Sequence, residues 1–98
     1  MAILEIRITE LAYSDIQEIE SYLFKSSPSI GRSFTEKIFR KIELLYDHPE
    51  IGRIVPEFRE SSIREIFQGK YRIVYLILNS NRIDILRIIH GSKLIDLG

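Results

Sequence analysis

The run Tyr71–Leu78 constrains the fold of this chain more than any other segment does. It reads Tyr-Arg-Ile-Val-Tyr-Leu-Ile-Leu, so apolar side chains fall on both faces of any strand that it forms. A strand with one solvated face alternates apolar and polar residues, whereas a strand that is apolar on both faces is covered on both sides. We therefore expect a central strand. Arg72 is its only charge, and it needs an ionic partner or a bound anion because an unpaired buried charge is costly.

Two further strand patterns flank this central run. Ile63–Gln68 precedes it across Gly69-Lys70, which suits a two-residue hairpin turn with glycine first. Ile83–His90 follows it across the turn Asn79-Ser80-Asn81. The three runs predict an antiparallel meander, in which Glu65 or Asp84 on a neighbouring strand would pair with Arg72.

The first half of the chain has a short strand pattern at residues 4–8 and then helical spacing. Thr9 or Ser14 caps the first expected helix, and Ser27 followed by Pro28 ends it and opens the second. Apolar residues recur at every third or fourth position in two stripes, Ala12, Ile16, Ile19 and Leu23, then Ile30, Phe34, Ile38, Ile42 and Leu45.

The order of these elements predicts the fold class. The second helix stops at His48-Pro49, and a loop with Gly52 and Pro56 leads to the three strands. The chain thus reads as a strand, a hairpin of two helices and a three-strand antiparallel meander. We expect an α+β fold with both helices on one face of the sheet, because their apolar stripes need a surface to cover.

Length and composition limit the organisation of the protein. A chain of 98 residues is too short for two hydrophobic cores, so residues 1–98 are expected to form one domain. The absence of cysteine excludes disulfides and thiolate metal sites and fits a reducing cytosol. The N-terminal residues do not resemble a signal peptide, and the longest apolar run, Ile73–Leu78, is too short to cross a bilayer. We expect a soluble, cytoplasmic protein.

The charges are balanced overall but divided unevenly along the chain. Residues 1–52 hold six Lys/Arg and nine Asp/Glu, a net charge of −3, and residues 53–98 hold eight and five, a net charge of +3. A positive second half would face an anion such as a phosphate or an acidic peptide. Solvated strand edges explain the same pattern equally well.

His90 is a second residue with chemical potential, because histidine titrates near neutrality. It ends the last predicted strand. If the preceding turn pairs residues of equal parity, Arg72 and His90 share one face of the sheet. The opposite parity would place Arg72 beside Arg87 and Ile89 instead. The sequence leaves both registers open.

Glu57 lies in an arginine-rich loop between Arg53 and Arg59. It is a candidate general base, and the alternative is that it forms a surface ion pair. The sequence contains no phosphate-binding glycine loop, no HExxH motif and no Cys/His metal spacing. We therefore expect neither a metal site nor a cofactor.

The second half of the chain resembles the RelE/ParE superfamily of toxins from type II toxin–antitoxin systems. No single motif carries the resemblance, but the ordered set does, at matching spacing over about half of the chain. The pieces are His48-Pro-Glu-Ile-Gly52-Arg53, Arg64-Glu65, Tyr71-Arg-Ile-Val-Tyr75 and Arg87-Ile-Ile-His90.

The resemblance implies a toxin that arrests bacterial growth until a cognate antitoxin covers it. The C-terminal segment of such an antitoxin drapes across the helices and sheet of the toxin, a surface to which Tyr13 and Tyr22 would contribute. The complex binds its promoter DNA through the antitoxin, so DNA contact by this chain would be indirect. Arg53, Arg64 and Arg87 are the basic side chains that we expect to bind a partner or target.

The superfamily divides by target. ParE-like members inhibit DNA gyrase, and RelE-like members cleave messenger RNA on the ribosome. For the RelE-like case, the resemblance implies Glu57 as base, Arg72 as phosphate clamp and His90 as acid.

The sequence favours the ParE-like alternative for three reasons. The chain has no net charge, whereas ribosome-dependent nucleases are strongly basic; the lysine cluster of RelE is missing; and no aromatic residue follows His90. RelE-like cleavage and a non-toxic binding member of the same fold are the alternatives.

Overall fold

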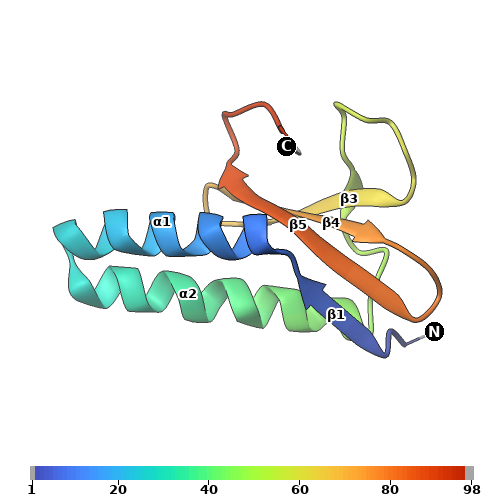
Figure 1. The fold of residues 1–98 in the computed structure, drawn as a ribbon, viewed down its shortest axis with the longest axis horizontal. Helices are drawn as coiled ribbons and strands as arrows, with labels where there is room; N and C mark the ends of the chain where they lie inside the picture. The colour runs from blue at the N-terminus through green and yellow to red at the C-terminus, as the bar shows by residue number, and fades with distance from the viewer. Residues whose placement is uncertain (1, 97–98) are drawn as a thin grey trace.

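The structure, a computed structural model that describes residues 2–96, contains two long helices and a five-stranded sheet (Figure 1). In chain order the elements are β1 (Glu5–Ile8), α1 (Glu10–Ser26), α2 (Pro28–Glu43), the 3-10 helix η1 (Leu44–Tyr46), β2 (Arg53–Ile54), β3 (Ile63–Gln68), β4 (Tyr71–Ile77) and β5 (Arg82–His90). The predicted α+β fold and its meander of three strands are confirmed.

The strand order in the sheet is β1-β5-β4-β3-β2, so β4 is the central strand, as its two apolar faces predict. Two features extend the predicted meander. β1 pairs with β5 in parallel, and the helical hairpin is the crossover that this pairing requires. Residues 53–54, expected in a loop, form β2 on the opposite edge; a two-residue strand is too short to show an alternating pattern.

The helix ends follow their capping residues. Thr9, rather than Ser14, caps α1, because its side chain accepts a hydrogen bond from the backbone N–H of Ala12. Ser27 ends α1 and caps α2 through the N–H of Ile30. The helices approach each other closely at Gly31, where an added Cβ would lie 3.0 Å from the backbone of Phe24.

Both helices pack their apolar stripes against one face of the sheet. Ile38 of α2 and Ile73, Ile83 and Ile85 of the central strands are completely buried in this core. None of the helices within residues 2–96 is long and apolar enough to cross a membrane.

The pairing of β4 with β5 changes register along its length. Near the turn, residues of equal parity are opposite each other, as in the pair Ile77 and Ile83. A bulge between Val74 and Tyr75 then shifts the register by one residue. Beyond the bulge Tyr71 is opposite His90 and Arg72 is opposite Ile89, so each of the two registers considered from the sequence occurs in one part of the hairpin.

Candidate functional site

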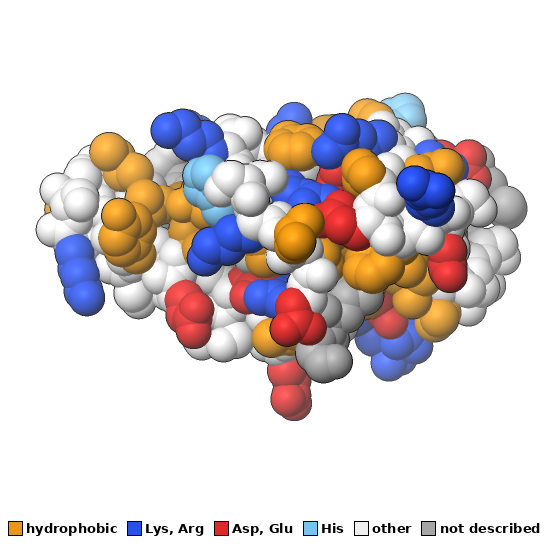
Figure 2. Space-filling view, turned by 90° about the horizontal axis from the view of Figure 1, so that it is seen from above, with side chains coloured by type: hydrophobic (Ala, Val, Ile, Leu, Met, Phe, Trp, Pro, Cys, Tyr) orange, Lys and Arg blue, Asp and Glu red, His pale blue; other side chains and the backbone are white. Residues whose placement is uncertain are grey.

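Arg72 lies on the face of the sheet opposite the helices, because it alternates with Ile73 of the helix-side core. Its exposed fraction is only 4%. The loop before β3 and the chain after β5 both extend over this face (Figure 1). Seen from above (Figure 2), Lys and Arg side chains lie across the middle of the molecule beside acidic ones, and hydrophobic side chains gather over the far end of the helical hairpin.

Four side chains around Arg72 form one ionic group, which we call the Arg72 cluster: Arg53, Glu57, Glu65 and Arg72. The Arg72 guanidinium donates through Nη1 and Nη2 to both carboxylate oxygens of Glu57 at 2.9 and 2.8 Å. Its Nε donates to Glu65, which also accepts from Arg53 Nε at 2.6 Å. The expected Arg72–Glu65 pair is therefore present, with Glu57 as a second carboxylate, so two carboxylates balance two guanidinium groups.

The cluster also holds the chain after β5. Arg72 Nη1 donates to the backbone oxygen of Lys93 at 3.1 Å, and the backbone N–H of Ile95 donates to Glu57 at 3.3 Å. Four of the five N–H groups that a guanidinium offers are thus directed at atoms of this chain.

The ion pair between Glu57 and Arg72 sets the protonation of these two groups. Hydrogen bonds from Arg72 lower the pKa of Glu57 from 4.5 to about 2, against the opposing effect of burial. The same hydrogen bonds with Glu57 raise the pKa of Arg72 above its ordinary value. Both groups are fully charged at neutral pH, and a carboxylate with so low a pKa is a poor proton acceptor.

His90 lies on the other face of the sheet from Arg72, because its cross-strand neighbour is Tyr71. The two rings meet edge to face with centroids 5.7 Å apart. The Nδ1 atom of His90 lies 2.7 Å from the Ser92 hydroxyl and accepts from the Ser92 N–H. The structure therefore brings Glu57 and Arg72 together and separates His90 from both.

The three arginines expected to bind a partner are engaged within the chain. Arg53 belongs to the Arg72 cluster, although its side chain is 59% exposed. Arg64 donates to backbone oxygens, including that of Gly52 at 3.0 Å. Arg87 forms a two-point ion pair with Asp15 of α1 at 2.8 and 2.9 Å, which fastens α1 to β5.

The His-Pro-x-x-Gly-Arg motif has a structural role that sequence reasoning missed. The Tyr75 hydroxyl, completely buried, donates to the backbone oxygen of Pro49 at 2.8 Å and accepts from the N–H of Gly52 at 3.0 Å. A Cβ on Gly52 would lie 2.6 Å from the backbone oxygen of Glu65. Glycine is required here because the chain passes directly over β3.

Overlapping hollows along α2 and β3 form a continuous groove, which we call the basic groove. It is lined by Ile30, Lys37, Lys41, Leu44, Ile51, Phe67 and Lys70. Within residues 2–96, none of its three lysines has an ion-pair partner. Arginines dominate the positive second half of the sequence, so these lysines were not among the predicted binding residues. The available signal was the spacing of Lys37, Lys41 and Leu44, which places them on one helix face.

In the part of the chain that the structure describes, no three His, Cys, Asp or Glu side chains are grouped so as to hold a metal ion.

Solved structures of two toxin–antitoxin systems have a similar fold. The chromosomal ParDE toxin–antitoxin system from P. aeruginosa has a similar solved structure, with a TM-score of 0.74 and 17% identity over 92% of this chain and 98% of that chain. The toxin–antitoxin complex RelBE2 from Mycobacterium tuberculosis has a TM-score of 0.59 and 24% identity over 92% and 99%. These likenesses show the fold. No curated protein sequence matches the chain.

The model of the ParE toxin of the type II toxin–antitoxin system parDE matches residues 6–95. This match covers nearly all of the 98 residues. The chain therefore belongs to the ParE toxin family, within the RelE/ParE superfamily of type II toxin–antitoxin toxins.

Proposed function

We propose that this toxin arrests growth in the cytoplasm by inhibiting DNA gyrase, without cleaving RNA, and that a cognate antitoxin neutralises it. The Arg72 cluster is the observation that carries the proposal. The residues that RNA cleavage would require are bound to each other or lie on opposite faces of the sheet.

Cleavage at a 2′-hydroxyl needs a base, an acid and a cation that converge on one phosphate. Glu57 has a pKa of about 2 and is bound to Arg72 through both oxygens. Arg72 is buried and directs its donors at the protein. His90 is on the far side of β4 and β5. A nuclease would have to break the two-point ion pair and cross the sheet, so the geometry supports a toxin that acts by binding.

The charge of the molecule supports the same choice. The net charge is zero, and most of the arginines in the second half are paired with carboxylates of the same chain. Ribosomal RNA is recognised mainly through cationic contacts to phosphate. Binding to a protein target such as gyrase does not require the toxin to carry an excess of positive charge.

For the antitoxin, we propose the basic groove as the docking surface. Its lysines lack ion-pair partners within residues 2–96, and apolar side chains lie between them. Ile30, Leu44 and Phe67 are 55%, 44% and 41% exposed. Such a surface suits a segment that carries acidic and apolar side chains and that folds on binding. Promoter DNA would then be bound by the antitoxin part of the complex.

The experiment induces the chain alone in bacteria and follows plasmid supercoiling, the DNA damage response and the ends of messenger RNA. We expect growth arrest with relaxed plasmid and a DNA damage response, and no new cuts by primer extension. The variants Glu57→Gln and His90→Gln should arrest growth as the unaltered chain does. Ribosomal A-site cuts that disappear in these variants would establish the RelE-like alternative, and unaffected growth would establish the non-toxic one.

A further inference from the structure

The first strand, β1, lies at one edge of the sheet (Figure 1). It pairs with β5 on one side, and within residues 2–96 no strand lies on its other side. The opposite edge is formed by β2, which has only two residues and is followed closely by Pro56. Short length and proline both block the pairing of an edge with a further strand. β1 is therefore the edge at which another strand can add.

The backbone groups of Ile6 point away from the sheet, towards this open edge. The N–H of Glu5 donates towards β5, to the backbone oxygen of Asn81 at 3.0 Å. The N–H of Thr9 donates in the same direction, to the backbone oxygen of Ile85 at 3.1 Å. Successive residues of a strand direct their N–H and C=O groups to alternate sides, so Ile6 directs both of its groups away from β5. In an antiparallel pair, two such residues opposite each other exchange both hydrogen bonds, so Ile6 can pair with Ile6 of a second copy across a two-fold axis.

The charged side chains of β1 complement such a pair. An antiparallel pair centred on Ile6 places Glu5 of each copy opposite Arg7 of the other, at positions where cross-strand side chains approach most closely. In the single chain these two side chains pair with each other at 2.9 Å, and they remain 49% and 57% exposed. A pair centred on Glu5 or on Arg7 would instead place like charges opposite each other. Charge and hydrogen-bond direction thus select the same register.

The neighbouring strand continues the charge pattern. Arg82 of β5 is in register with Glu5, and Asp84 is in register with Arg7. Arg82 and Asp84 are themselves joined by two hydrogen bonds, at 2.8 and 3.1 Å. Across the joined sheets the row would run from Arg82 and Glu5 of one copy to Arg7 and Asp84 of the other. Every neighbour in this row has the opposite sign, which favours a second copy of the same chain as the partner.

Apolar side chains lie on the other face of β1. Ile6 and Ile8 pack against the helix-side core but are only partly buried. Leu4, just before the strand, is 76% exposed. In the register centred on Ile6, Leu4 of one copy comes opposite Ile8 of the other. The pairing therefore removes apolar surface from water on this face.

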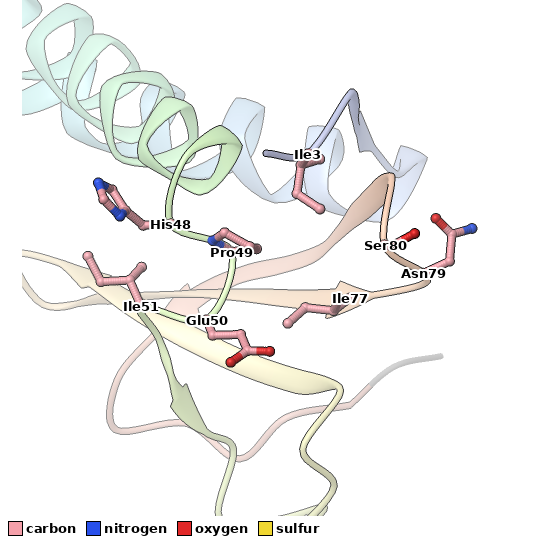
Figure 3. A pocket seen from close by; sticks show the side chains of 8 residues that line it. All are labelled: Ile3, His48, Pro49, Glu50, Ile51, Ile77, Asn79 and Ser80. Atoms are coloured by element: carbon pink, nitrogen blue, oxygen red, sulfur yellow. The ribbon is translucent and has the colours of Figure 1, made fainter. Parts of the chain in front are cut away.

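The start of the strand is held in place by the rest of the fold. Ile3 is only 5% exposed, and its N–H donates to the backbone oxygen of Tyr46 at 2.8 Å. Its side chain lines a pocket together with Pro49 and Ile77 (Figure 3). The edge is thus already formed in the single chain, so that dimer formation does not have to order it.

We propose that the free toxin forms a two-fold dimer in which β1 pairs antiparallel with β1 of a second copy and joins the two five-stranded sheets. The self-complementary order Glu5-Ile6-Arg7 carries the assignment, because it combines the outward backbone groups of Ile6 with opposite charges on both sides. The contact is short and belongs with small interfaces that bury less than about 1,200 Å². The dimer therefore dissociates on dilution.

The test compares the unaltered chain with Glu5→Arg and with Arg7→Glu by analytical ultracentrifugation over a series of concentrations. Each variant places like charges opposite each other across the two-fold axis, so we expect the dissociation constant of the dimer to rise about tenfold or more. Arg40→Glu is the matched control, since it reverses an exposed, ion-paired arginine on α2, and it should dimerise as the unaltered chain does. Unchanged far-ultraviolet circular dichroism shows that each variant is folded.

A mixture of the two β1 variants is the most specific sample. One chain then carries glutamate at both positions and the other carries arginine at both, so opposite charges again lie across the two-fold axis. We expect a mixed dimer at concentrations where neither variant dimerises alone. The neighbours within each chain are the same in the separate and the mixed samples, so a restored dimer requires pairing between chains at this edge.

Three results would overturn the proposal: an unaltered chain that is monomeric at every concentration, a dimer that both variants retain, or a mixture that stays monomeric. If the unaltered chain is monomeric and Arg7→Glu weakens binding of the purified antitoxin, the edge accepts a strand of the antitoxin and not a second copy. None of these measurements involves gyrase, so their outcome is independent of the proposed function.

Discussion

At the scale of single residues, Arg72 shows how a charge is accommodated in the central strand of a small sheet. The guanidinium is buried, but two carboxylates and a backbone oxygen take up its donors. Desolvation of such a group is costly, and good geometry offsets this cost without necessarily adding net stability. Removal of one partner, however, lowers the stability of the fold, because the remaining buried charge is left uncompensated.

Replacement of Arg72 by methionine should therefore be strongly destabilising. Glu65, whose side chain is completely buried, keeps only Arg53 as a partner, and Glu57 loses its ion pair. We expect the free energy of unfolding, measured by urea denaturation, to fall by about 3–5 kcal/mol. Arg40→Met is the control: its exposed pair with Glu36 should contribute no more than about 0.5 kcal/mol. Equal effects in the two variants would contradict the structural role of Arg72.

The lowered pKa of Glu57 predicts a particular acid dependence. The folded-state pKa is about 2 and the unfolded value is 4.5, so the carboxylate stabilises the fold above the unfolded value. This contribution is lost as the pH falls from about 4.5 towards 2. Denaturation across that range should show a shallower loss of stability in Glu57→Gln than in the unaltered chain. Parallel curves would mean that Glu57 is not paired in solution.

The sequence predicted part of the Arg72 environment. Glu65 was a candidate partner because the predicted hairpin places it on the strand next to Arg72. The contact with Glu57 joins a loop to a strand fifteen positions away, and no local pattern reports such a contact. The lysines of the basic groove were missed for a related reason, since their surroundings depend on how α2 is placed over β3.

At the scale of elements, structure that follows from local periodicity can be predicted from the sequence, whereas pairing between distant segments cannot. The helices and the three long strands follow from apolar spacing and turn residues. The parallel pairing of β1 with β5 and the bulge at Val74 and Tyr75 do not, because each depends on residues far apart in the chain. The bulge determines which side chains the site contains, because it places His90 on the opposite face of the sheet from Arg72.

Gly52→Ala tests how the chain is held across β3. The added methyl group would lie 2.6 Å from the Glu65 oxygen and 2.7 Å from the Tyr75 hydroxyl, so the segment must move. We expect a loss of about 1–3 kcal/mol in thermal or urea unfolding, as for other overpacked sites. Tyr75→Phe, which removes the hydroxyl without adding bulk, should cost about 1–3 kcal/mol because the buried Gly52 N–H loses its acceptor. An unaffected Gly52→Ala variant would show that the segment is not fixed there.

At the scale of the whole molecule, charge is sorted by residue type. Most arginines of the second half serve internal ion pairs, whereas the lysines of the basic groove have no such partners within residues 2–96. The sequence pointed to the positive second half as the part that faces an anion, whereas two of the three groove lysines, Lys37 and Lys41, lie in the first half. These lysines lie along α2 and the β3–β4 turn rather than on the open face of the sheet.

Reversing the groove charges should separate antitoxin binding from toxicity. In the double variant Lys37→Glu, Lys41→Glu, we expect the affinity for the purified cognate antitoxin to fall about tenfold or more, with a weaker dependence on salt. Lys25→Glu, at the end of α1 and outside the groove, is the matched control. Calorimetric titration at two salt concentrations measures both effects. Unaltered antitoxin affinity in the double variant would exclude the groove as the docking surface.

We propose that this ParE-family chain acts by binding gyrase and that its Arg72 cluster is structural. The most direct measurement adds the purified chain to purified gyrase with relaxed plasmid, with and without antitoxin, and in parallel to ribosomes that are translating a defined message. We expect loss of supercoiling and trapped cleavage complexes, both reversed by antitoxin, with the message intact. Normal supercoiling together with A-site cleavage that Glu57→Gln abolishes would contradict it.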